Sequence, residues 1–509
     1  MSDSLYIYRR NDLNSVTHFP YTSMLGALLD HAAATPDKTF LIEKDREYSY
    51  AQCVRIAYGY AQFLKSQGVC AGDCVVVKTT QSVATVLCDM ALQMLHAIYV
   101  PLEKAVAADR ANFIIEKTDA KLFISDKDLG VNAQFLNLKE VCNYEAAPEE
   151  LPAVIEEPAG DSVGEILFTT GTTGTSKGVS MSNNATVRTA ENVAVAIGIA
   201  EDDVEIVPVP INHAYGLRRM YANLLVGSTC IIMDGIVFIA ALWKAIEKYH
   251  VTGLALVPAS LAVIFKLSGD RLGDYRDQLR YIQIGSAVLS PADKQKLCEL
   301  LPHTRLYDFY GCSEAGCVCT ADYNQFKDKQ KSLGRPACNA SFRLICEDGS
   351  IVIYPTPNVT GLLSYGGSMN MTGYWKEPKL TAETLVDGFI NTKDLAYFDD
   401  DGFIFLLGRQ DDVINTAGAK IAPTEIEEVA MQCPLIADCA VIGVPDPMAG
   451  EVPKMFVVPA EGQEFDPVAI NSFILDRLEA YKAPKIIVSI DAIPRTYNGK
   501  ILRRELKNM

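Results

Sequence analysis

Short apolar runs alternate with longer amphipathic stretches through most of the chain. The apolar runs are rich in β-branched residues, which is typical of buried strands. Most of them precede a stretch with helical spacing, and Ser290 with Pro291 supplies an N-cap and a first-turn proline for one such helix. This alternation predicts an α/β fold with mainly parallel sheets. The expected strands are residues 75–78, 205–209, 229–233, 254–257 and 281–284.

The last hundred residues show a different pattern, which predicts a small α+β domain. Thr424 is expected to cap a helix that starts with acidic residues. The polar stretch 408–412 is the expected linker, so we predict an N-terminal domain over 1–409 and a C-terminal domain over 410–509. The expected elements here are strands at 403–407, 439–444, 455–458 and 485–490, and a helix at 467–478.

Composition restricts the class of protein. Hydrophobic residues make up 49% and charged residues 21%, as in ordinary globular proteins. The net charge is −17, which disfavours a nucleic-acid partner and an anionic membrane surface. The N-terminus lacks the apolar segment of a signal peptide, and the longest apolar run, 236–243, is too short to span a bilayer. We therefore expect a soluble protein of the cytoplasm.

The fourteen cysteines do not suggest a disulfide framework. They are spread along the chain, and most lie in apolar runs, as reduced thiols of cytosolic proteins do. The densest group, Cys312, Cys317 and Cys319, lacks a second pair at metal-ligand spacing. We interpret these cysteines as packing residues.

The most informative local segment is rich in glycine and threonine. Residues 169–175 are seven consecutive Gly or Thr residues that follow an apolar strand, and Lys177 comes two residues later. Free backbone N–H groups, hydroxyl groups and a cation together can bind a polyphosphate. A flexible surface turn is the alternative. The segment is not a P-loop, because Gly178 rather than a hydroxyl residue follows the lysine.

This segment resembles the phosphate loop of the adenylate-forming superfamily, which includes acyl- and aryl-CoA ligases, peptide-synthetase adenylation domains and firefly-type luciferases. Five further motifs resemble those of the family and occur in its order, so the resemblance covers nearly the whole chain. It implies a large N-terminal domain of layered α/β subdomains and a small mobile C-terminal domain. These motifs are residues 310–314, 392–395, 408–412, 418–427 and 494–501.

The resemblance also implies roles for individual residues in ATP binding. Glu314 would bind Mg²⁺, and Asp394 with Arg409 would hold the ribose, although each could instead be an ordinary surface or linker charge. Lys393 replaces the family's usual glycine before Asp394. The phosphate contacts would be Thr170, Gly171, Thr172, Thr173, Gly174 and Lys177, and the nucleoside contacts Gly285, Ser286, Ala287, Asp308, Tyr310 and Ser313.

In the C-terminal domain, the resemblance points to a catalytic lysine and a hinge. Lys500 would bridge the substrate carboxylate and the α-phosphate, although nothing local distinguishes it from neighbouring basic residues. Asp411 would be the hinge of a domain rotation, after which Gly418 would line a tunnel for the pantetheine thiol of coenzyme A.

The acyl pocket is expected near His213, Tyr215, Arg219, Phe309 and Gly311. By resemblance, His213 gates the pocket and is grouped with the catalytic residues, and a structural histidine is the alternative. Phe309 replaces a common glycine and should narrow the pocket. Arg219 would face an anionic or polar substrate group, or else turn away and pair with a protein acid. No aspartate stands where amino-acid-activating members carry one.

The implied reaction is the ATP-dependent ligation of a carboxylic acid to coenzyme A, with Mg²⁺ as cofactor. A small or aromatic acid, with a second polar or anionic group as an option, fits the narrowed pocket. The first alternative is an enzyme that loads an acyl carrier protein. A luciferase-like oxygenase and a non-catalytic nucleotide-binding relative are more remote.

Overall fold

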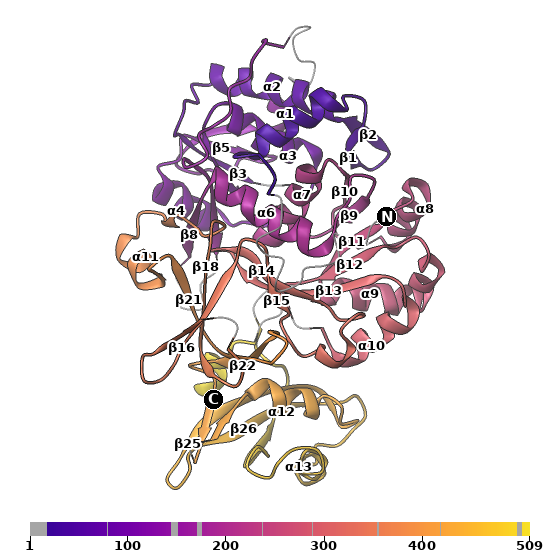
Figure 1. The fold of residues 1–509 in the computed structure, drawn as a ribbon, viewed down its shortest axis with the longest axis vertical. Helices are drawn as coiled ribbons and strands as arrows, with labels where there is room; N and C mark the ends of the chain where they lie inside the picture. The colour runs from indigo at the N-terminus through magenta and orange to yellow at the C-terminus, as the bar shows by residue number, and fades with distance from the viewer. Residues whose placement is uncertain are drawn as a thin grey trace. The chain divides into compact units, whose positions relative to one another are not determined.

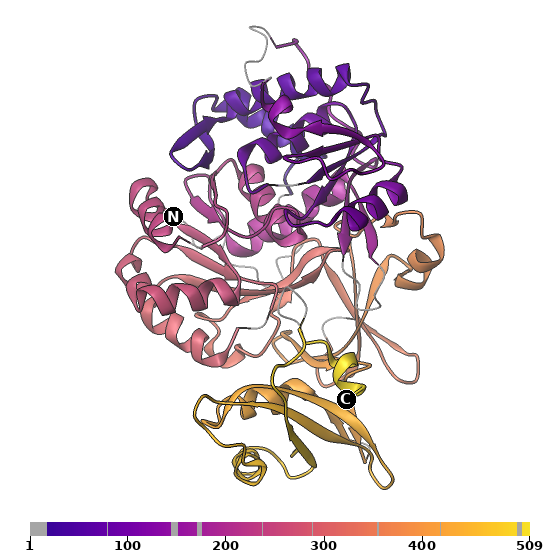
Figure 2. The ribbon, with the colours of Figure 1, turned by 180° about the vertical axis from the view of Figure 1, so that it is seen from behind.

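The computed structural model describes residues 18–78, 80–143, 151–169, 176–236, 238–287, 289–353, 356–417, 419–495 and 501–509. The chain forms two compact units. The first comprises residues 1–285, 292–341 and 365–390, and the second comprises residues 286–291, 342–364 and 391–509. Figures 1 and 2 show the ribbon from opposite sides.

One of the two large sheets of the first unit has seven strands. Its five strands from β7 to β6 run parallel, and β8 and β19 extend the sheet in antiparallel fashion at one edge. In spatial order the strands are β19 (Gly373–Tyr374), β8 (Lys177–Ser182), β7 (Val163–Thr169), β4 (Ile98–Leu102), β3 (Cys74–Lys78), β5 (Leu122–Ser125) and β6 (Gln134–Asn137).

The second large sheet of this unit has nine strands. Those from β13 to β1 are parallel, and antiparallel strands flank them on both sides. In spatial order they are β15 (Arg335–Pro336), β14 (Gly316–Asp322), β13 (Arg305–Cys312), β12 (Tyr281–Ile284), β11 (Gly253–Leu256), β9 (Val204–Val207), β10 (Thr229–Ile232), β1 (Thr39–Glu43) and β2 (Arg46–Ser49).

Helices pack on both sheets, and α6 contacts strands of each, so it lies between them (Figure 1). Ser182 caps its N-terminus by accepting a hydrogen bond from Ala185 N, and Gly198 ends it in a left-handed conformation. The helices of this unit are α1 (Met24–Ala34), α2 (Tyr50–Ser66), α3 (Val83–Met94), α4 (Ala108–Thr118), α5 (Leu138–Cys142), α6 (Asn183–Ile197), α7 (Ala214–Val226), α8 (Ile239–Tyr249), α9 (Pro258–Ser268), α10 (Pro291–Leu300) and α11 (Pro378–Thr384), with 3₁₀ turns η3 (Arg271–Tyr275) and η4 (Lys327–Lys329).

The second unit contains most of a six-stranded sheet and all of a five-stranded one. The first has β17 (Ile351–Ile353), β16 (Ser341–Ile345), β18 (Thr360–Gly366), β21 (Phe389–Phe398), β20 (Leu385–Val386) and β22 (Ile404–Arg409). The second has β24 (Ala419–Ile421), β23 (Ile414–Thr416), β26 (Gly450–Pro459), β25 (Ile436–Asp446) and β27 (Ile486–Ser489), with α12 (Pro423–Ala430), α13 (Pro467–Leu475) and α14 (Arg503–Lys507).

The predicted α/β class with mainly parallel sheets is confirmed, and each strand predicted in the C-terminal part is present. One local expectation is wrong. Thr424 does not cap α12, because the helix already begins at Pro423 and Ala422 occupies the N-cap position without a side-chain hydrogen bond. Proline at the first helical position has a helix-compatible φ, which starts the helix earlier than the hydroxyl pattern indicates. The helix predicted to reach residue 478 ends at Leu475.

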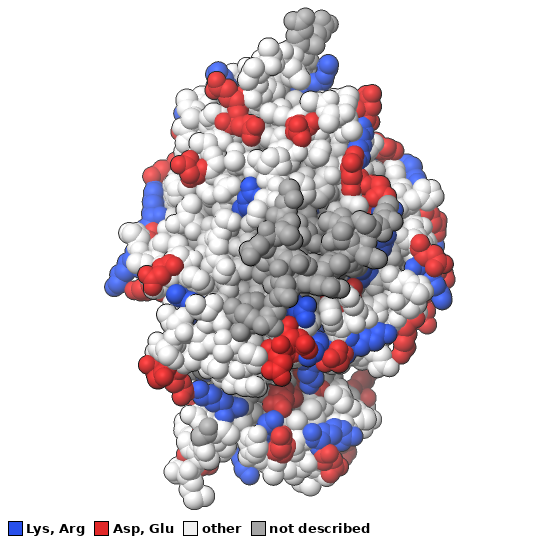
Figure 3. Space-filling view, in the orientation of Figure 1, with Lys and Arg blue, Asp and Glu red and all other residues white. Residues whose placement is uncertain are grey.

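The domain boundary between residues 409 and 410 stays a prediction. Residues 391–409 and the C-terminal residues belong to the same compact unit. The boundary between the two units therefore does not fall at Asp411 and does not test a hinge there. Within the described residues, no helix combines the length and the apolar composition needed to cross a membrane. Figure 3 shows acidic and basic side chains interspersed on the face turned to the viewer.

Candidate active site

The strands β7 and β8 form a hairpin at the base of the Gly/Thr segment. Thr169 at the end of β7 pairs with Lys177 at the start of β8, and Ser176 Oγ donates to Thr169 O at 2.9 Å. Thr169 and Lys177, which flank residues 170–175 in the sequence, therefore lie side by side on paired strands. Several predicted site residues lie outside the described residues, namely Thr170, Gly171, Thr172, Thr173, Gly174, Gly418 and Lys500.

Glu314 lies in the turn that connects β13 and β14, together with Ser313. Its backbone O accepts a hydrogen bond from Met371 N at 2.7 Å, and its Oε1 accepts one from Tyr374 Oη at 2.7 Å. The ammonium group of Lys177 lies over the ring face of the same tyrosine, with Nζ 5.4 Å from the ring centroid. The structure thus brings Glu314 and Lys177 to opposite parts of one tyrosine side chain. Tyr374 lies in none of the sequence motifs and was not among the predicted site residues.

Aromatic side chains gather where the acyl pocket was expected. The rings of Tyr215 and Phe309 have centroids 4.7 Å apart. Tyr215 Oη donates to the backbone carbonyls of Leu256 and Gln283, at 3.1 Å and 2.9 Å. A Cβ on Gly285 would lie 1.8 Å from Phe309 Cε1, so only glycine allows the Phe309 ring to take this position.

His213 precedes the first residue of α7 and is half-buried. Asn212 Nδ2 lies 3.3 Å from its Nε2. Burial lowers the pKa of His213. The negative charge of Glu103 raises this pKa, and the positive charge of Arg110 lowers it, so the pKa remains below its usual value. A neutral imidazole is therefore favoured at this position. Its role as a pocket gate stays a prediction.

Arg219, which was expected at the acyl pocket, has a protein acid as its partner. The side chain is fully buried, and its Nε and Nη2 lie 2.8 Å and 2.6 Å from Glu205 Oε1. Its Nη1 donates to Gln283 Oε1 at 3.1 Å. A buried guanidinium is stable only when it is paired, and the partner here is a protein acid. This is the pairing expected of the alternative reading, and a contact of Arg219 with the substrate stays a prediction.

Of the residues expected at the nucleoside, Asp308 and Tyr310 lie on β13. Asp308 forms an ion pair with Lys294, although burial still raises the pKa of its carboxyl group. Tyr310 meets Tyr365 edge to face, with ring centroids 6.4 Å apart. Gly311, which was expected at the acyl pocket, lies against the opposite strand, where a Cβ would come within 1.9 Å of Gly316 O. The contacts of Asp308 and Tyr310 with a nucleotide, and of Gly311 with the acid, stay predictions.

After Gly285 the chain bends at Ser286 and Ala287. Ser286 has a φ of 71°, in the left-handed region, and Ser286 and Ala287 are both exposed. Exposed backbone in this conformation can be approached closely by a flat ring. The expected adenine contact of this segment stays a prediction.

The second unit holds the residues expected at the ribose. Arg409 Nε donates to Asp394 Oδ1 at 3.1 Å across the β21–β22 pair, and Asp394 is 8% exposed. Thr392 Oγ1 accepts from Asp394 N at 3.0 Å. Lys393 between them has a φ of 63°, a conformation that glycine adopts without strain. The glycine that the resemblance implies at this position would suit this φ, and Lys393 adopts it in its place.

The described residues around position 500 contact the C-terminal part of the chain. Arg495 and Ile501 form an antiparallel bridge, and Leu502 N donates to Pro494 O at 2.8 Å. Arg503 then binds both carboxylate oxygens of Glu427. The expected hinge residue Asp411 accepts a hydrogen bond through its backbone O from Lys507 Nζ at 3.0 Å.

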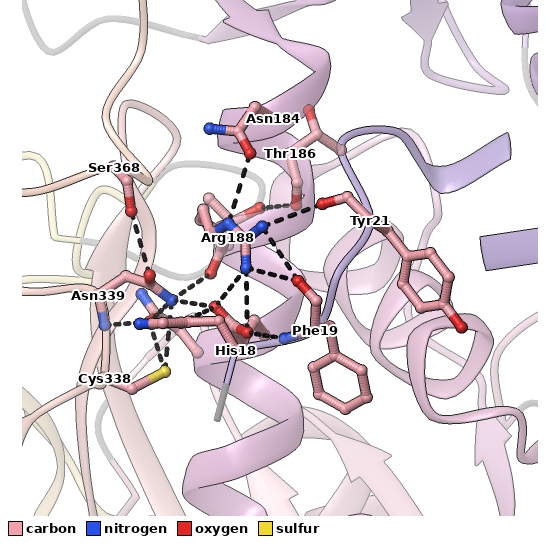
Figure 4. A network of polar contacts seen from close by, with 12 residues as sticks. His18, Phe19, Tyr21, Asn184, Thr186, Arg188, Cys338, Asn339 and Ser368 are labelled. Atoms are coloured by element: carbon pink, nitrogen blue, oxygen red, sulfur yellow. Dashed lines mark hydrogen bonds and ion pairs between the residues drawn. The ribbon is translucent and has the colours of Figure 1, made fainter. Parts of the chain in front are cut away.

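A polar network on α6 supports the strand that follows Glu314 (Figure 4). The buried carboxylate of Glu191 accepts hydrogen bonds from Phe19 N, Asn339 Nδ2 and Arg188 Nη1, at 2.7, 2.8 and 3.0 Å. His18 Nδ1 lies 2.9 Å from it. Burial would raise the pKa of Glu191, but these hydrogen bonds outweigh burial and hold that pKa below its usual value.

The next residue of α6 reaches the strand itself. Asn192 Nδ2 donates to Cys317 O at 2.9 Å, and Asn192 Oδ1 accepts from Asn339 N at 2.9 Å. Cys317 lies three residues after Glu314, so α6 fixes the backbone beside the Glu314 turn. No sequence motif marks these residues, because their partners lie far apart along the chain.

Comparisons with known proteins identify the family of the chain. The family model described as "AMP-binding enzyme" matches residues 28–375, and the model for the C-terminal domain of such enzymes matches residues 425–500. The chain therefore belongs to the AMP-binding enzyme family. The adenylate-forming resemblance is confirmed, and the class of enzyme is the AMP-forming acyl-CoA synthetase.

Individual relatives extend over nearly the whole chain. A 2-succinylbenzoate–CoA ligase of Bacillus cereus is 27% identical, with 95% of this chain and 98% of that protein covered. An indoleacetate–CoA ligase of Aromatoleum aromaticum is 29% identical, with 94% and 96% covered. The solved o-succinylbenzoate coenzyme A synthetase of Bacillus subtilis, in complex with ATP and magnesium ion, is 23% identical with a TM-score of 0.83, covering 94% of this chain and 99% of that one.

Proposed function

We propose that the chain is an ATP-dependent carboxylic acid–CoA ligase that forms an acyl-adenylate and then a thioester. The observation that carries this proposal is the grouping of Lys177 and Glu314 around Tyr374, at the exit of the Gly/Thr segment. A cation and a carboxylate beside such a segment suit a polyphosphate that arrives with a metal ion.

The donor set fits magnesium that enters with ATP. Among the residues that the structure describes, no group of three or more His, Cys, Asp or Glu side chains could hold a metal ion. Magnesium at nucleotide sites needs only one or two carboxylates besides phosphate oxygens, and Glu314 would supply one. When bound, the ion would offset charge on the phosphates.

In the first half-reaction, a carboxylate oxygen of the acid attacks the α-phosphorus of ATP. The bond between the α-phosphorus and the bridging oxygen breaks, and pyrophosphate leaves. Lys177 would bind the departing phosphates, and Asp394 with Arg409 would hold the ribose. We assign Lys500 to the negative charge that develops around the α-phosphate.

In the second half-reaction, the thiolate of coenzyme A attacks the acyl carbon, and the bond to the AMP oxygen breaks. A rotation about Asp411 would replace Lys500 by the Gly418 face between the two steps. A carrier-protein thiol would react in the same way, so an acyl carrier protein is the alternative acceptor. We favour coenzyme A because the named full-length relatives are CoA ligases.

The acid is proposed to be aromatic or small. The packing of Phe309 against Gly285 and Tyr215 supports a short, flat pocket bordered by aromatic rings. The relatives named for 2-succinylbenzoate and indoleacetate use aromatic acids. A second carboxylate on the acid would need a partner other than Arg219, since Glu205 already pairs with that residue.

We also propose a cytoplasmic location. All fourteen cysteines are free thiols, which is the usual state in a reducing compartment.

The test is a pyrophosphate-release screen over aliphatic, aromatic and dicarboxylic acids, with and without coenzyme A. We expect acid-dependent release with aromatic acids, steady turnover only when coenzyme A is present, and loss of release in Lys500→Ala with ATP binding retained. Strong activity on palmitate and none on aromatic or short acids would contradict the substrate proposal. Turnover only with a carrier protein would favour the alternative acceptor.

A further inference from the structure

Tyr374 lies on a short strand that is tied closely to β8. Gly373 and Tyr374 pair with Ser180 and Val179, and Ser180 Oγ donates to Gly373 O at 2.6 Å. Tyr374 N donates to Thr381 Oγ1 at 2.9 Å. The backbone of Tyr374 is therefore held on both sides, and the position of its ring is fixed relative to Lys177 at the start of β8.

The two ends of the Tyr374 side chain make different contacts. The hydroxyl donates to Glu314 Oε1 at 2.7 Å, and the ring face lies 5.4 Å from Lys177 Nζ. The hydroxyl donor and the backbone contacts of Tyr374 together orient Glu314 Oε1 through one defined hydrogen bond.

We propose that Tyr374 is a positioning residue that sets the geometry of Glu314 toward magnesium and of Lys177 toward the phosphates of ATP. This inference rests on the proposed ATP-dependent function. The hydroxyl acts on Glu314, because a carboxylate that is already held by a hydrogen bond loses less conformational entropy when it binds a cation. The ring acts on the lysine, because an ammonium within about 6 Å of an aromatic centroid is attracted to its face.

The two roles can be separated by two substitutions. Tyr374→Phe removes the hydroxyl and keeps the ring, whereas Tyr374→Leu removes both. Calorimetric titration with ATP, in magnesium and in chelator, measures each role without any acid substrate. Tyr374→Phe should weaken ATP binding in magnesium by roughly 10- to 100-fold and leave binding in chelator unchanged. Tyr374→Leu should also weaken binding in chelator, by roughly two- to fivefold.

The matched control is Tyr323→Phe. Tyr323 is buried, and its hydroxyl has no hydrogen-bond partner in the described part of the chain. This variant should bind ATP as the unaltered protein does in both conditions. Thermal unfolding of all three variants shows whether each one is folded.

Two results would overturn the proposal. One is a folded Tyr374→Phe protein with unaltered binding in magnesium, and the other is an equal loss in magnesium and in chelator, which a purely structural role would give. Failure of the unaltered protein to bind ATP at all would contradict the proposed function instead.

Discussion

Replacing Arg219 distinguishes a structural from a substrate-binding role for this residue. In Arg219→Met, the carboxylate of Glu205 loses the guanidinium that lies 2.6 Å and 2.8 Å away in the core. Among the residues that the structure describes, Glu205 then keeps the neutral donors Asn223 Nδ2 and Tyr281 Oη, each at 3.0 Å. Removing one partner of a buried ion pair typically costs about 3–5 kcal/mol, because the other charge stays buried.

Denaturation by urea, followed by tryptophan fluorescence, measures this cost. Both tryptophans, Trp243 and Trp375, lie in the same compact unit as Arg219, so the signal reports the affected unit. The double variant Arg219→Met with Glu205→Gln removes both charges and should recover at least half of the loss, since the uncompensated charge is gone.

The order of preference among acids should not change in Arg219→Met at a temperature where the variant is folded. A variant of normal stability with an altered preference for acids would refute this reasoning. So would a double variant that is less stable than the sum of the two single changes predicts.

Three further predictions concern stability and nucleotide binding. Burial raises the pKa of Asp89 from 3.8 to about 7. The unfolding free energy should therefore fall by up to roughly 4 kcal/mol as the pH rises between these two values. Urea titrations of Asp89→Asn at pH values from about 5 to 8 should not show this fall. Gly285→Ala should lower the unfolding free energy by about 1–3 kcal/mol, because the added Cβ would lie 1.8 Å from Phe309 Cε1. The double variant with Phe309→Ala should regain stability and should accept longer acids in the pyrophosphate assay. Asp394→Asn should weaken ATP binding by roughly tenfold in calorimetry, because one charged acceptor for the ribose is lost; an unaltered affinity would exclude that role.

The elements with strong local patterns could be predicted from the sequence. The strand predicted at 281–284 has those bounds, and Pro291 begins α10 as expected. These patterns are local, because strand period and first-turn proline depend on a few adjacent residues. The family could be predicted for the same reason, since each of its motifs is a short run of adjacent residues and the motifs follow one another in a fixed order.

What the sequence could not predict depends on partners that are distant along the chain. Arg219 on α7 pairs with Glu205 on β9, and only the packing of that helix on that strand brings them together. Tyr374 reaches Glu314 across 60 positions because β19 pairs with β8 at the edge of a sheet. Such pairings follow from topology, which motif spacing does not specify.

The most direct test of the account follows oxygen from the acid to AMP. The acid with the highest rate in the screen is labelled with a heavy oxygen isotope in its carboxylate, and the AMP formed with coenzyme A is analysed by mass spectrometry. Attack on the α-phosphorus followed by thiolysis predicts AMP that carries one labelled oxygen, with unlabelled pyrophosphate. Unlabelled AMP, or ADP and phosphate as products, would contradict the proposed acyl-adenylate reaction.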